Sequence, residues 1–366
     1  MSSKNDRHFM DLALRLAARG RGLTAPNPNV GCVIVQGDRI VGRGWTKPGG
    51  RPHAERVALD QAGELAAGAT AYVTLEPCAH TGETPPCADG LIVAGIRRVV
   101  VGVTDPDPRV DGGGLATLRA AGVEVELGVM AEQAELAMAG FLTRLTEARP
   151  AVTIKLATSL DGRIATATGD SHWITGDAAR QRAHLLRASH DAILIGSGTA
   201  LADDPELTCR LPGLENCSPI RVVLDRRGRL PADSRLARSA ARTPLWIVTS
   251  AEGASRLAPL SDAGVSIITL EEGDDHRFFG GAMAVLAERR VNDLLIEGGG
   301  KVAAAALRAD MVDRVEWFHA ASIIGGDGVS AVDDFGIETL ADARLFRHID
   351  EVVCGEDRLH RFERLR

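Results

Sequence analysis

The chain has 366 residues, of which 45% are apolar and 25% are charged, and its formal net charge is −7. This length predicts two domains, because a single hydrophobic core rarely grows past about 250–300 residues. The acidic charge argues against general nucleic-acid binding, and six cysteines are too few for a disulfide scaffold. No apolar stretch approaches ~18 residues, so we expect no membrane span and a reducing, cytoplasmic environment.

Helical and strand patterns alternate in the first half of the chain. Apolar residues recur at helical spacing in some segments, and short β-branched runs bounded by turn residues separate them. Such alternation predicts an α/β layer fold. We expect helices at 8–19, 52–67, 88–94, 115–121 and 131–147, and strands at 30–35, 71–75, 98–103 and 123–127.

A second α/β domain is expected after Pro150, because proline ends the preceding helix. We place the boundary near residue 148, which gives domains of residues 1–148 and 149–366. Helices are expected at 177–189, 281–290 and 301–309, and strands at 152–157, 192–195, 220–224, 245–248, 265–270, 293–296, 315–320 and 351–354. The basic run 358–366 is interpreted as surface.

Three soft or borderline metal ligands stand out in the first half. His53 opens an expected helix, and Cys78 and Cys87 each follow a proline. One imidazole and two thiolates suit zinc, and three protein ligands leave a fourth position for water, as in catalytic sites. Proline is common at helix starts, where the helix dipole favours a thiolate. This pattern predicts a catalytic zinc site.

Glu55 is the expected proton carrier of this site. It lies two residues after His53, within the first helical turn, where its carboxylate could take a proton from a bound water and pass it to a leaving amine. The alternative, scattered core and surface residues, is disfavoured because His-x-Glu, Pro-Cys and a second Cys match the zinc-deaminase signature. Eight residues separate the two cysteines here, whereas nucleobase-editing deaminases have two.

Two polar segments stand out in the second half. Residues 155–164 run from a strand into a turn, with Lys155, Ser159 and Asp161 suggesting the rim of a pocket. Glu297 is followed by three glycines and an expected helix from Lys301. Glycine lets a phosphate approach the backbone, and a helix N-terminus supplies oriented N–H groups. The alternative for this second segment is an ordinary tight strand–helix turn.

The whole pattern resembles the bifunctional deaminase/reductase family of riboflavin biosynthesis, RibD. The resemblance rests on the long cysteine spacing in residues 76–87, on Pro-Asn-Pro-Asn-Val-Gly at 26–31, and on Asp-Pro-Asp-Pro at 105–108 with three glycines at 112–114. It implies a cytidine-deaminase-like domain followed by a dihydrofolate-reductase-like domain. The implied substrate is 2,5-diamino-6-ribosylamino-4(3H)-pyrimidinone 5′-phosphate, which loses its 2-amino group before NADPH reduces its ribosyl group to ribityl.

The resemblance also implies roles for individual residues. In the first domain His53, Cys78 and Cys87 would hold Zn²⁺, with Glu55 as proton donor and Asn27 and Asp105 as pyrimidine contacts. Family members commonly have a histidine seven residues before the zinc histidine, where this chain has Thr46. In the second domain the implied NADPH contacts are Ala157, Trp173, Thr199, Asp203, Gly299, Gly300, Lys301, Val302 and Ala303. The implied substrate contacts are Ser171, Arg187, Leu207, Arg210 and Glu297, the two arginines being suited to phosphate.

Two other functions remain open from the sequence. One is a tRNA or nucleobase deaminase fused to an unrelated oxidoreductase, against which the cysteine spacing and the acidic charge argue. The other is a non-enzymatic zinc-binding protein. The expected partners are small phosphorylated ribosylaminopyrimidines, without nucleic acid or membrane, and a homodimer through the second domain is expected by resemblance. Residue identities alone do not decide between NADPH and NADH.

Overall fold

A computed structural model describes residues 4–80, 85–271 and 273–365. The chain divides into two compact units, Met1–Ala148 and Arg149–Arg366. No helix in the described parts of the chain is long and apolar enough to cross a lipid bilayer.

The first unit is built on a five-stranded sheet with strand order β2-β1-β3-β4-β5. The strands β3, β4 and β5 are parallel, whereas β1 runs antiparallel to both β2 and β3. The strands are β1 (Gly31–Gln36), β2 (Arg39–Trp45), β3 (Thr70–Leu75), β4 (Arg98–Val103) and β5 (Glu124–Leu127). The helices are α1 (Lys4–Ala17), α2 (Ala54–Ala62), α3 (Cys87–Val93), α4 (Gly113–Ala120), α5 (Ala131–Ala137) and α6 (Ala139–Glu147).

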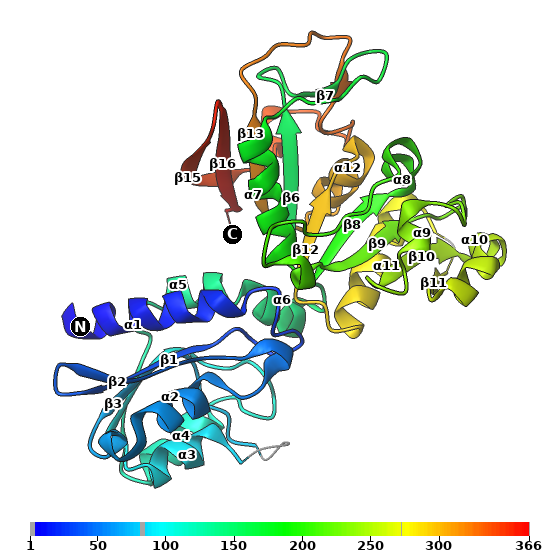
Figure 1. Ribbon diagram of the computed structural model, residues 1–366. Helices are drawn as coiled ribbons and strands as arrows, with labels where there is room; N and C mark the ends of the chain where they lie inside the picture. Colours follow the sequence, from blue (N-terminus) through cyan, green and yellow to red (C-terminus); the bar gives the residue numbers. More distant parts are fainter. Residues whose placement is uncertain (1–3, 81–84, 272, 366) are drawn as a thin grey trace. The chain divides into compact units, whose positions relative to one another are not determined.

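Helices cover both faces of this sheet, with α1 and α5 on one face and α2, α3 and α4 on the other (Figure 1). Alternate residues of one strand therefore enter different cores. Cys32 and Ile34 of β1 pack on the α2 side, and Val33 and Val35 pack on the α1 side. Coverage of both faces explains why β1 reads as a continuous apolar run rather than an alternating one.

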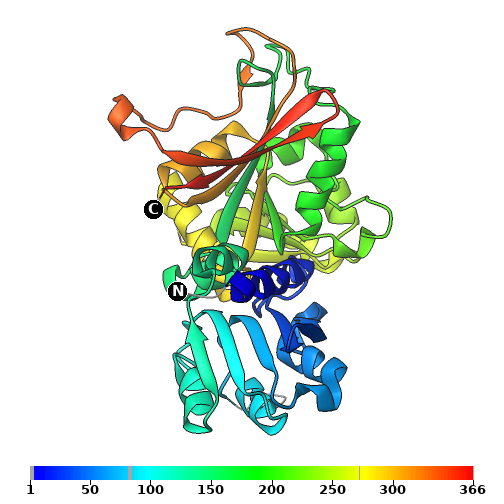
Figure 2. The same ribbon diagram turned by 90° about the vertical axis from the view of Figure 1, so that its left-hand side faces the viewer.

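The second unit contains a nine-stranded sheet with order β11-β10-β9-β8-β12-β6-β13-β16-β15. Seven neighbouring strands are parallel, and the hairpin β15–β16 closes one end in antiparallel pairing. Figure 2 shows this hairpin in red. The strands are β6 (Ala151–Thr158), β8 (Ala192–Gly196), β9 (Ile220–Leu224), β10 (Leu245–Ser250), β11 (Ser266–Leu270), β12 (Asp293–Glu297), β13 (Val312–His319), β15 (Phe346–Cys354) and β16 (Asp357–Arg364), with a separate two-stranded pair of β7 (Arg163–Ala165) and β14 (Val329–Ser330).

Two hydrophobic cores flank the large sheet. One is formed with α11 and α12, and the other with α7, α9 and α10. The main helices of this unit are α7 (Asp177–Ala188), α8 (Ser197–Asp203), α9 (Arg235–Arg238), α10 (Ala251–Leu257), α11 (Asp275–Glu288) and α12 (Gly300–Arg308). In such parallel sheets, ligands bind beyond the carboxyl ends of the strands.

Some expectations from the sequence need correction. The basic run 358–366 is not merely surface, because its residues to Arg364 form β16 between β13 and β15. The strand expected at 351–354 begins at Phe346, and the helix expected at 281–290 begins at Asp275. The helix expected at 131–147 is interrupted at Met138.

Candidate active sites

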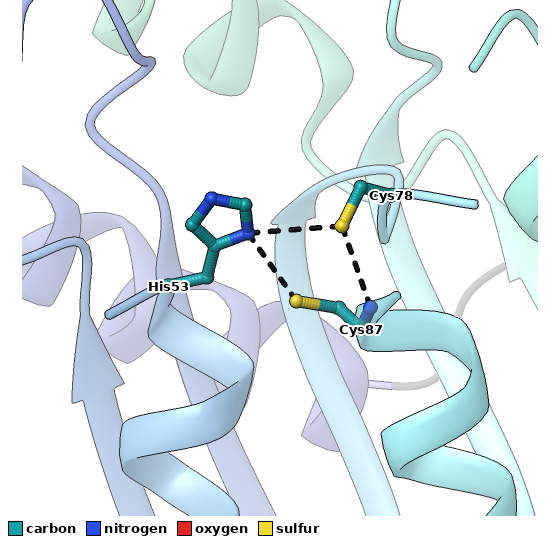
Figure 3. Close-up of side chains that lie close together, drawn as sticks. All are labelled: His53, Cys78 and Cys87. Atoms are coloured by element: carbon teal, nitrogen blue, oxygen red, sulfur yellow. Dashed lines mark hydrogen bonds between the residues drawn. The ribbon is translucent and has the colours of Figure 1, made fainter. Parts of the chain in front are cut away.

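A cluster of three possible metal ligands lies at two helix starts and one strand end of the first unit. His53 is the N-cap of α2, Cys87 is the first residue of α3, and Cys78 follows β3. The imidazole and both sulfur atoms point toward one another (Figure 3). Their ligand atoms all lie within 4.8 Å of one another, and the cluster is the one such group of His, Cys, Asp or Glu among the described residues.

The ligand atoms already contact one another. His53 Nδ1 lies 3.3 Å from Cys87 Sγ and 3.7 Å from Cys78 Sγ. The backbone N–H of Cys87 donates to Cys78 Sγ at 3.3 Å. Two thiols and an imidazole at these separations are the donor set that zinc prefers, so the residues present fit this metal.

The close packing of α2 on β2 places His53. A Cβ added to Gly44 would lie 2.0 Å from the carbonyl oxygen of Ala54, so only glycine lets the first turn of α2 lie this close to the strand. The sequence therefore fixes the position of the helix start, and with it the histidine.

The two cysteine thiols shift each other's pKa in opposite directions. A hydrogen bond from the Cys87 thiol lowers the pKa of Cys78 to about 4, and the same interaction raises the pKa of Cys87. Cys78 is therefore the more acidic of the two thiols. Binding of a divalent cation by both sulfurs would release the thiol protons.

Glu55 lies in the first turn of α2 and is 3% exposed. Burial raises the pKa of its carboxyl group to about 7, against the opposing effect of the His53 charge. A carboxyl group with a pKa near neutrality can both accept and donate a proton at physiological pH, which suits general acid–base catalysis.

Glu55, His53 and Cys78 line a cavity of about 120 Å³. The two residues expected to contact a pyrimidine, Asn27 and Asp105, line the same cavity. Burial raises the pKa of Asp105 to about 6. The structure thus places these sequence-predicted residues around one cavity. Cys87 does not line the cavity but contacts His53 and Cys78.

The cavity is also lined by ionisable residues that the sequence did not single out as site residues: Arg51, Glu76, His80, Asp107 and Arg109. Asp107 and Arg109 form an ion pair at its rim. A signal was available for them, because they lie within or beside the Asp-Pro-Asp-Pro motif. Residues 81–84, part of the motif between the two cysteines, lie outside the described residues.

Thr46 occupies the position of the commonly found histidine and lines the cavity. Its hydroxyl oxygen accepts a hydrogen bond from the Val30 backbone N–H at 3.0 Å, and its own N–H donates to the Val30 carbonyl at 2.9 Å. The side chain is 2% exposed. Thr46 therefore ties the start of β1 to the end of β2 beside the cavity.

A larger cavity of about 480 Å³ lies in the second unit. It is lined by seven of the residues that the resemblance assigns to NADPH or substrate: Ala157, Ser171, Trp173, Arg187, Asp203, Arg210 and Glu297. Residues not assigned from the sequence also line it, including Lys155, Thr175, Arg180 and His184. Lys155 was noted as a polar rim residue without an assigned role.

A buried charge cluster forms one wall of this cavity. Arg187 donates two hydrogen bonds to the Glu297 carboxylate, at 2.8 and 2.9 Å, and Lys155 Nζ lies 3.5 Å from the same carboxylate. The parallel register pairs Lys155 of β6 directly with Glu297 of β12. Burial alone would raise the pKa of Glu297, but the two cations lower it to about 2. The cluster keeps one net positive charge.

The glycine turn after β12 lies beside α8. A Cβ added to Gly299 would lie 3.0 Å from the hydroxyl of Thr199, and Gly299 has φ +84°. The backbone N–H groups of Val302 and Ala303 already donate to the Gly299 carbonyl. Thr199 and this turn are thus brought together, although neither lines the 480 Å³ cavity.

Leu207 is the one predicted substrate contact whose side chain lies in a core. It is 3% exposed, belongs to the core with α7, and has φ +56°. The next residue, Thr208, accepts a hydrogen bond from Arg187 Nη1 at 3.0 Å. Any contact of Leu207 with a ligand would therefore involve its backbone.

Comparison with known proteins matches each of the two units to a different family. Residues 3–103 match the family described as cytidine and deoxycytidylate deaminase zinc-binding region, and residues 150–354 match the RibD C-terminal domain. The riboflavin biosynthesis protein RibD of Escherichia coli is 42% identical over 365 residues, which cover 95% of this chain and 98% of the relative. RibD of Aquifex aeolicus is 40% identical and covers 98% of both chains.

Two solved structures match nearly the whole chain. RibD of Acinetobacter baumannii has a TM-score of 0.88 at 37% identity, with 99% of each chain covered. The Thermotoga maritima protein, described as a diaminohydroxyphosphoribosylaminopyrimidine deaminase/5-amino-6-(5-phosphoribosylamino)uracil reductase, has a TM-score of 0.86 at 35% identity and covers 99% of each chain.

Fold and site together define a bifunctional enzyme, a zinc-dependent deaminase joined to an NADPH-dependent reductase. The chain belongs to the RibD family of riboflavin biosynthesis. The predictions of fold class, bifunctional activity and cofactors are thereby confirmed, and the alternatives of a tRNA deaminase or a non-enzymatic zinc protein are not favoured.

Proposed function

We propose that the first unit deaminates 2,5-diamino-6-ribosylamino-4(3H)-pyrimidinone 5′-phosphate, with His53, Cys78 and Cys87 as zinc ligands and Glu55 as proton carrier. The observation that carries this proposal is the meeting of three donor atoms, within 4.8 Å of one another, and a buried carboxyl group at one cavity. The name of the Thermotoga maritima relative supplies the substrate class. We assign this unit to residues 1–148 and the reductase to residues 149–366.

Zinc, when bound, lowers the pKa of a coordinated water and so supplies a hydroxide at neutral pH. Glu55 would take a proton from the attacking water and pass it to the 2-amino group, which would leave as ammonia. Its pKa of about 7 allows both transfers. Asn27 and Asp105, at the same cavity, orient the pyrimidine through its amide and amino edges.

The second unit then reduces the ribosyl group of 5-amino-6-(5-phosphoribosylamino)uracil. We assign the charged wall of Lys155, Arg187 and Glu297 to the sugar, because its net positive charge faces the 480 Å³ cavity. Arg210, whose side chain is 56% exposed, is available for the sugar phosphate. Ser171 adds a hydroxyl to this substrate wall, and Leu207 contributes its backbone.

NADPH supplies the hydride when bound. We assign its nicotinamide half to the side of the cavity lined by Ala157, Trp173 and Asp203, and its phosphates to Thr199 and the start of α12. At that start the amides of Val302 and Ala303 are used within the helix. Gly299, Gly300 and Lys301 are therefore the positions that we expect to face phosphate oxygens.

We further propose that the enzyme works in the cytoplasm, where thiols stay reduced.

We also propose that two copies of the chain pair through the exposed edge of β15. The sheet ends at β15, and Leu345, Ile349 and Val353 on or beside it are 67%, 45% and 65% exposed. Sedimentation equilibrium checks the dimer, which Ile349→Asp should weaken.

One assay tests the enzymatic proposal. The purified protein, loaded with zinc and given the diaminopyrimidine phosphate and NADPH, should release ammonia and then oxidise NADPH. Given the deaminated intermediate, it should oxidise NADPH without ammonia release. Absence of both reactions would overturn the proposed function, and absence of ammonia alone would overturn the assignment of the first unit.

A further inference from the structure

The carboxylate of Glu76, close to the zinc ligands in the sequence, accepts hydrogen bonds from four backbone N–H groups. Glu76, directly after β3, is 3% exposed. Its Oε1 accepts hydrogen bonds from the N–H groups of Gly114 and Leu115, at 2.9 and 3.1 Å. Its Oε2 accepts from those of Gly112 and Asp105, at 3.2 and 3.3 Å. Four backbone donors from two separate segments therefore meet at one side chain.

A carboxylate is the side chain that suits this position. Its two oxygens accept up to about four hydrogen bonds and carry no donor. Three of the four N–H groups belong to the start of α4, where the helix dipole also favours a negative charge. In glutamine one oxygen would be replaced by an NH₂ group, which would face N–H groups and could not accept from them.

The start of α4 also lies unusually close to the chain that leads to the metal ligands. A Cβ added to Gly114 would lie 1.9 Å from the carbonyl oxygen of Pro77. Glycine at this position lets α4 pack directly against the Pro77 peptide, one residue before Cys78. This contact gives the last glycine of the motif, Gly114, a structural reason that zinc chemistry alone does not provide.

Glu76 thus connects two functional parts of the deaminase cavity. It lies two residues before Cys78, and it holds the backbone N–H of Asp105, whose side chain lines the same cavity. We infer that Glu76 is a positioning residue, which fixes the Cys78 turn and the Asp105 turn relative to each other through the start of α4. This inference rests on the proposed zinc site.

The test compares Glu76→Gln with Asp6→Asn, a matched control in the same unit. Asp6 is also a buried carboxylate, 2% exposed, but it accepts from Tyr72 and Arg98 on the α1 side of the sheet. Zinc affinity is measured by competition with a chromophoric chelator. The absorption of the cobalt-substituted protein reports thiolate coordination, and NADPH oxidation with the deaminated intermediate confirms that the second unit is intact.

Glu76→Gln should weaken zinc binding by about 10- to 100-fold, as expected for residues that support metal ligands, and should shift the cobalt–thiolate absorption. It should also raise the KM for the deaminase substrate, because Asp105 loses its backbone anchor. Asp6→Asn should leave zinc affinity, the cobalt spectrum and KM unchanged at a comparable loss of stability.

Unchanged zinc affinity and KM in Glu76→Gln, with wild type binding zinc and Cys78→Ser failing to bind it, would overturn the inference and leave the proposed function standing. Equal effects of the two variants would also overturn it, because they would show general destabilisation. If Glu76→Gln does not fold, Gly114→Ala is used instead, since its Cβ would meet the Pro77 carbonyl and displace the start of α4 while keeping Glu76. Unchanged zinc affinity and KM in that variant would overturn the inference. A wild type that binds no zinc would overturn the proposed function, and the inference with it.

Discussion

The deaminase cavity and the reductase cavity are assembled from the sequence in different ways. His53 and Glu55 share one helix start, and Cys78 and Cys87 are nine positions apart. In the reductase, Arg187 and Glu297 form their ion pair across 110 positions of sequence. The first site is therefore determined largely by local motifs at helix starts, and the second by the packing of α7 and β6 against β12, which are distant in sequence. A local motif allows the chemistry of a site to be predicted from the sequence. A charge cluster whose members are distant in sequence can be recognised only from the structure.

The largest effect that we expect comes from the local motif. Glu55→Gln should lower kcat for deamination by about 10²- to 10⁴-fold, because it removes the group that moves the proton. Zinc content, measured by atomic emission, should stay at the wild-type value, and NADPH oxidation with the deaminated intermediate should persist. Normal ammonia release from this variant would show that another group carries the proton.

In the reductase cavity, loss of the carboxylate that Arg187 and Lys155 share should act mainly on the stability of the folded protein. Glu297→Gln should cost about 3–5 kcal/mol of the free energy of unfolding, because it leaves the buried cations Arg187 and Lys155 without their carboxylate. Urea unfolding followed by intrinsic fluorescence at neutral pH measures this loss.

The loss of stability caused by Glu297→Gln should also depend on pH. The folded pKa of Glu297, about 2, lies below the ordinary value, so its stabilisation is complete above about pH 5 and is lost as pH falls toward 2. The difference between wild type and Glu297→Gln should therefore narrow as pH falls from 5 to 3. A constant or widening difference would contradict an ionised Glu297 in the folded protein.

A smaller effect is expected at Arg210 of the reductase, where the test distinguishes a loss of substrate binding from a loss of stability. Arg210→Ala should raise the KM for the phosphorylated intermediate by about 10- to 100-fold, the loss of a hydrogen-bonded charge, with kcat little changed. Arg235→Ala is the matched control, because Arg235 also pairs with Glu206 but does not line the cavity. Equal KM values for the two variants would argue against a phosphate contact at Arg210.

The smallest effect concerns the departure from the family at Thr46. Thr46→Val should cost about 0.5–1.5 kcal/mol of stability, because the buried Val30 N–H loses the Thr46 hydroxyl and keeps only the Pro28 carbonyl as acceptor. Thr46→Ser keeps the hydroxyl and should retain most of the stability. Thermal unfolding of the two variants distinguishes these results, and a fully stable Thr46→Val would show that the hydrogen bond is not needed.

The sequence predicted the α/β alternation and most strands, because apolar runs and turn residues mark them clearly. It missed β2, in which Gly42, Arg43 and Gly44 interrupt the apolar pattern, and β16, whose many charged residues are not typical of a strand that lies between two others. The earlier start of α11 follows from Asp274, whose side chain caps Arg277 N–H, a signal that sequence reading could have used.

The candidate sites were predictable to different degrees. The metal cluster was predicted completely, since its residue types and spacing are distinctive. Arg51 was not predicted, because nothing in the sequence around it distinguishes it from a surface charge. Arg109 was not predicted either, although it directly follows the Asp-Pro-Asp-Pro motif. The NADPH contacts of Val302 and Ala303 follow from the resemblance and stay a prediction, while their amides donate to the Gly299 carbonyl at the start of α12.

Each cavity is lined by residues of only one unit, and each depends on a different cofactor. The supply of metal and the supply of reducing equivalents therefore act on different steps. A cell short of zinc would contain an enzyme that still reduces its intermediate but no longer makes it, so that the first step would limit flux. A cell short of NADPH would instead accumulate the deaminated intermediate.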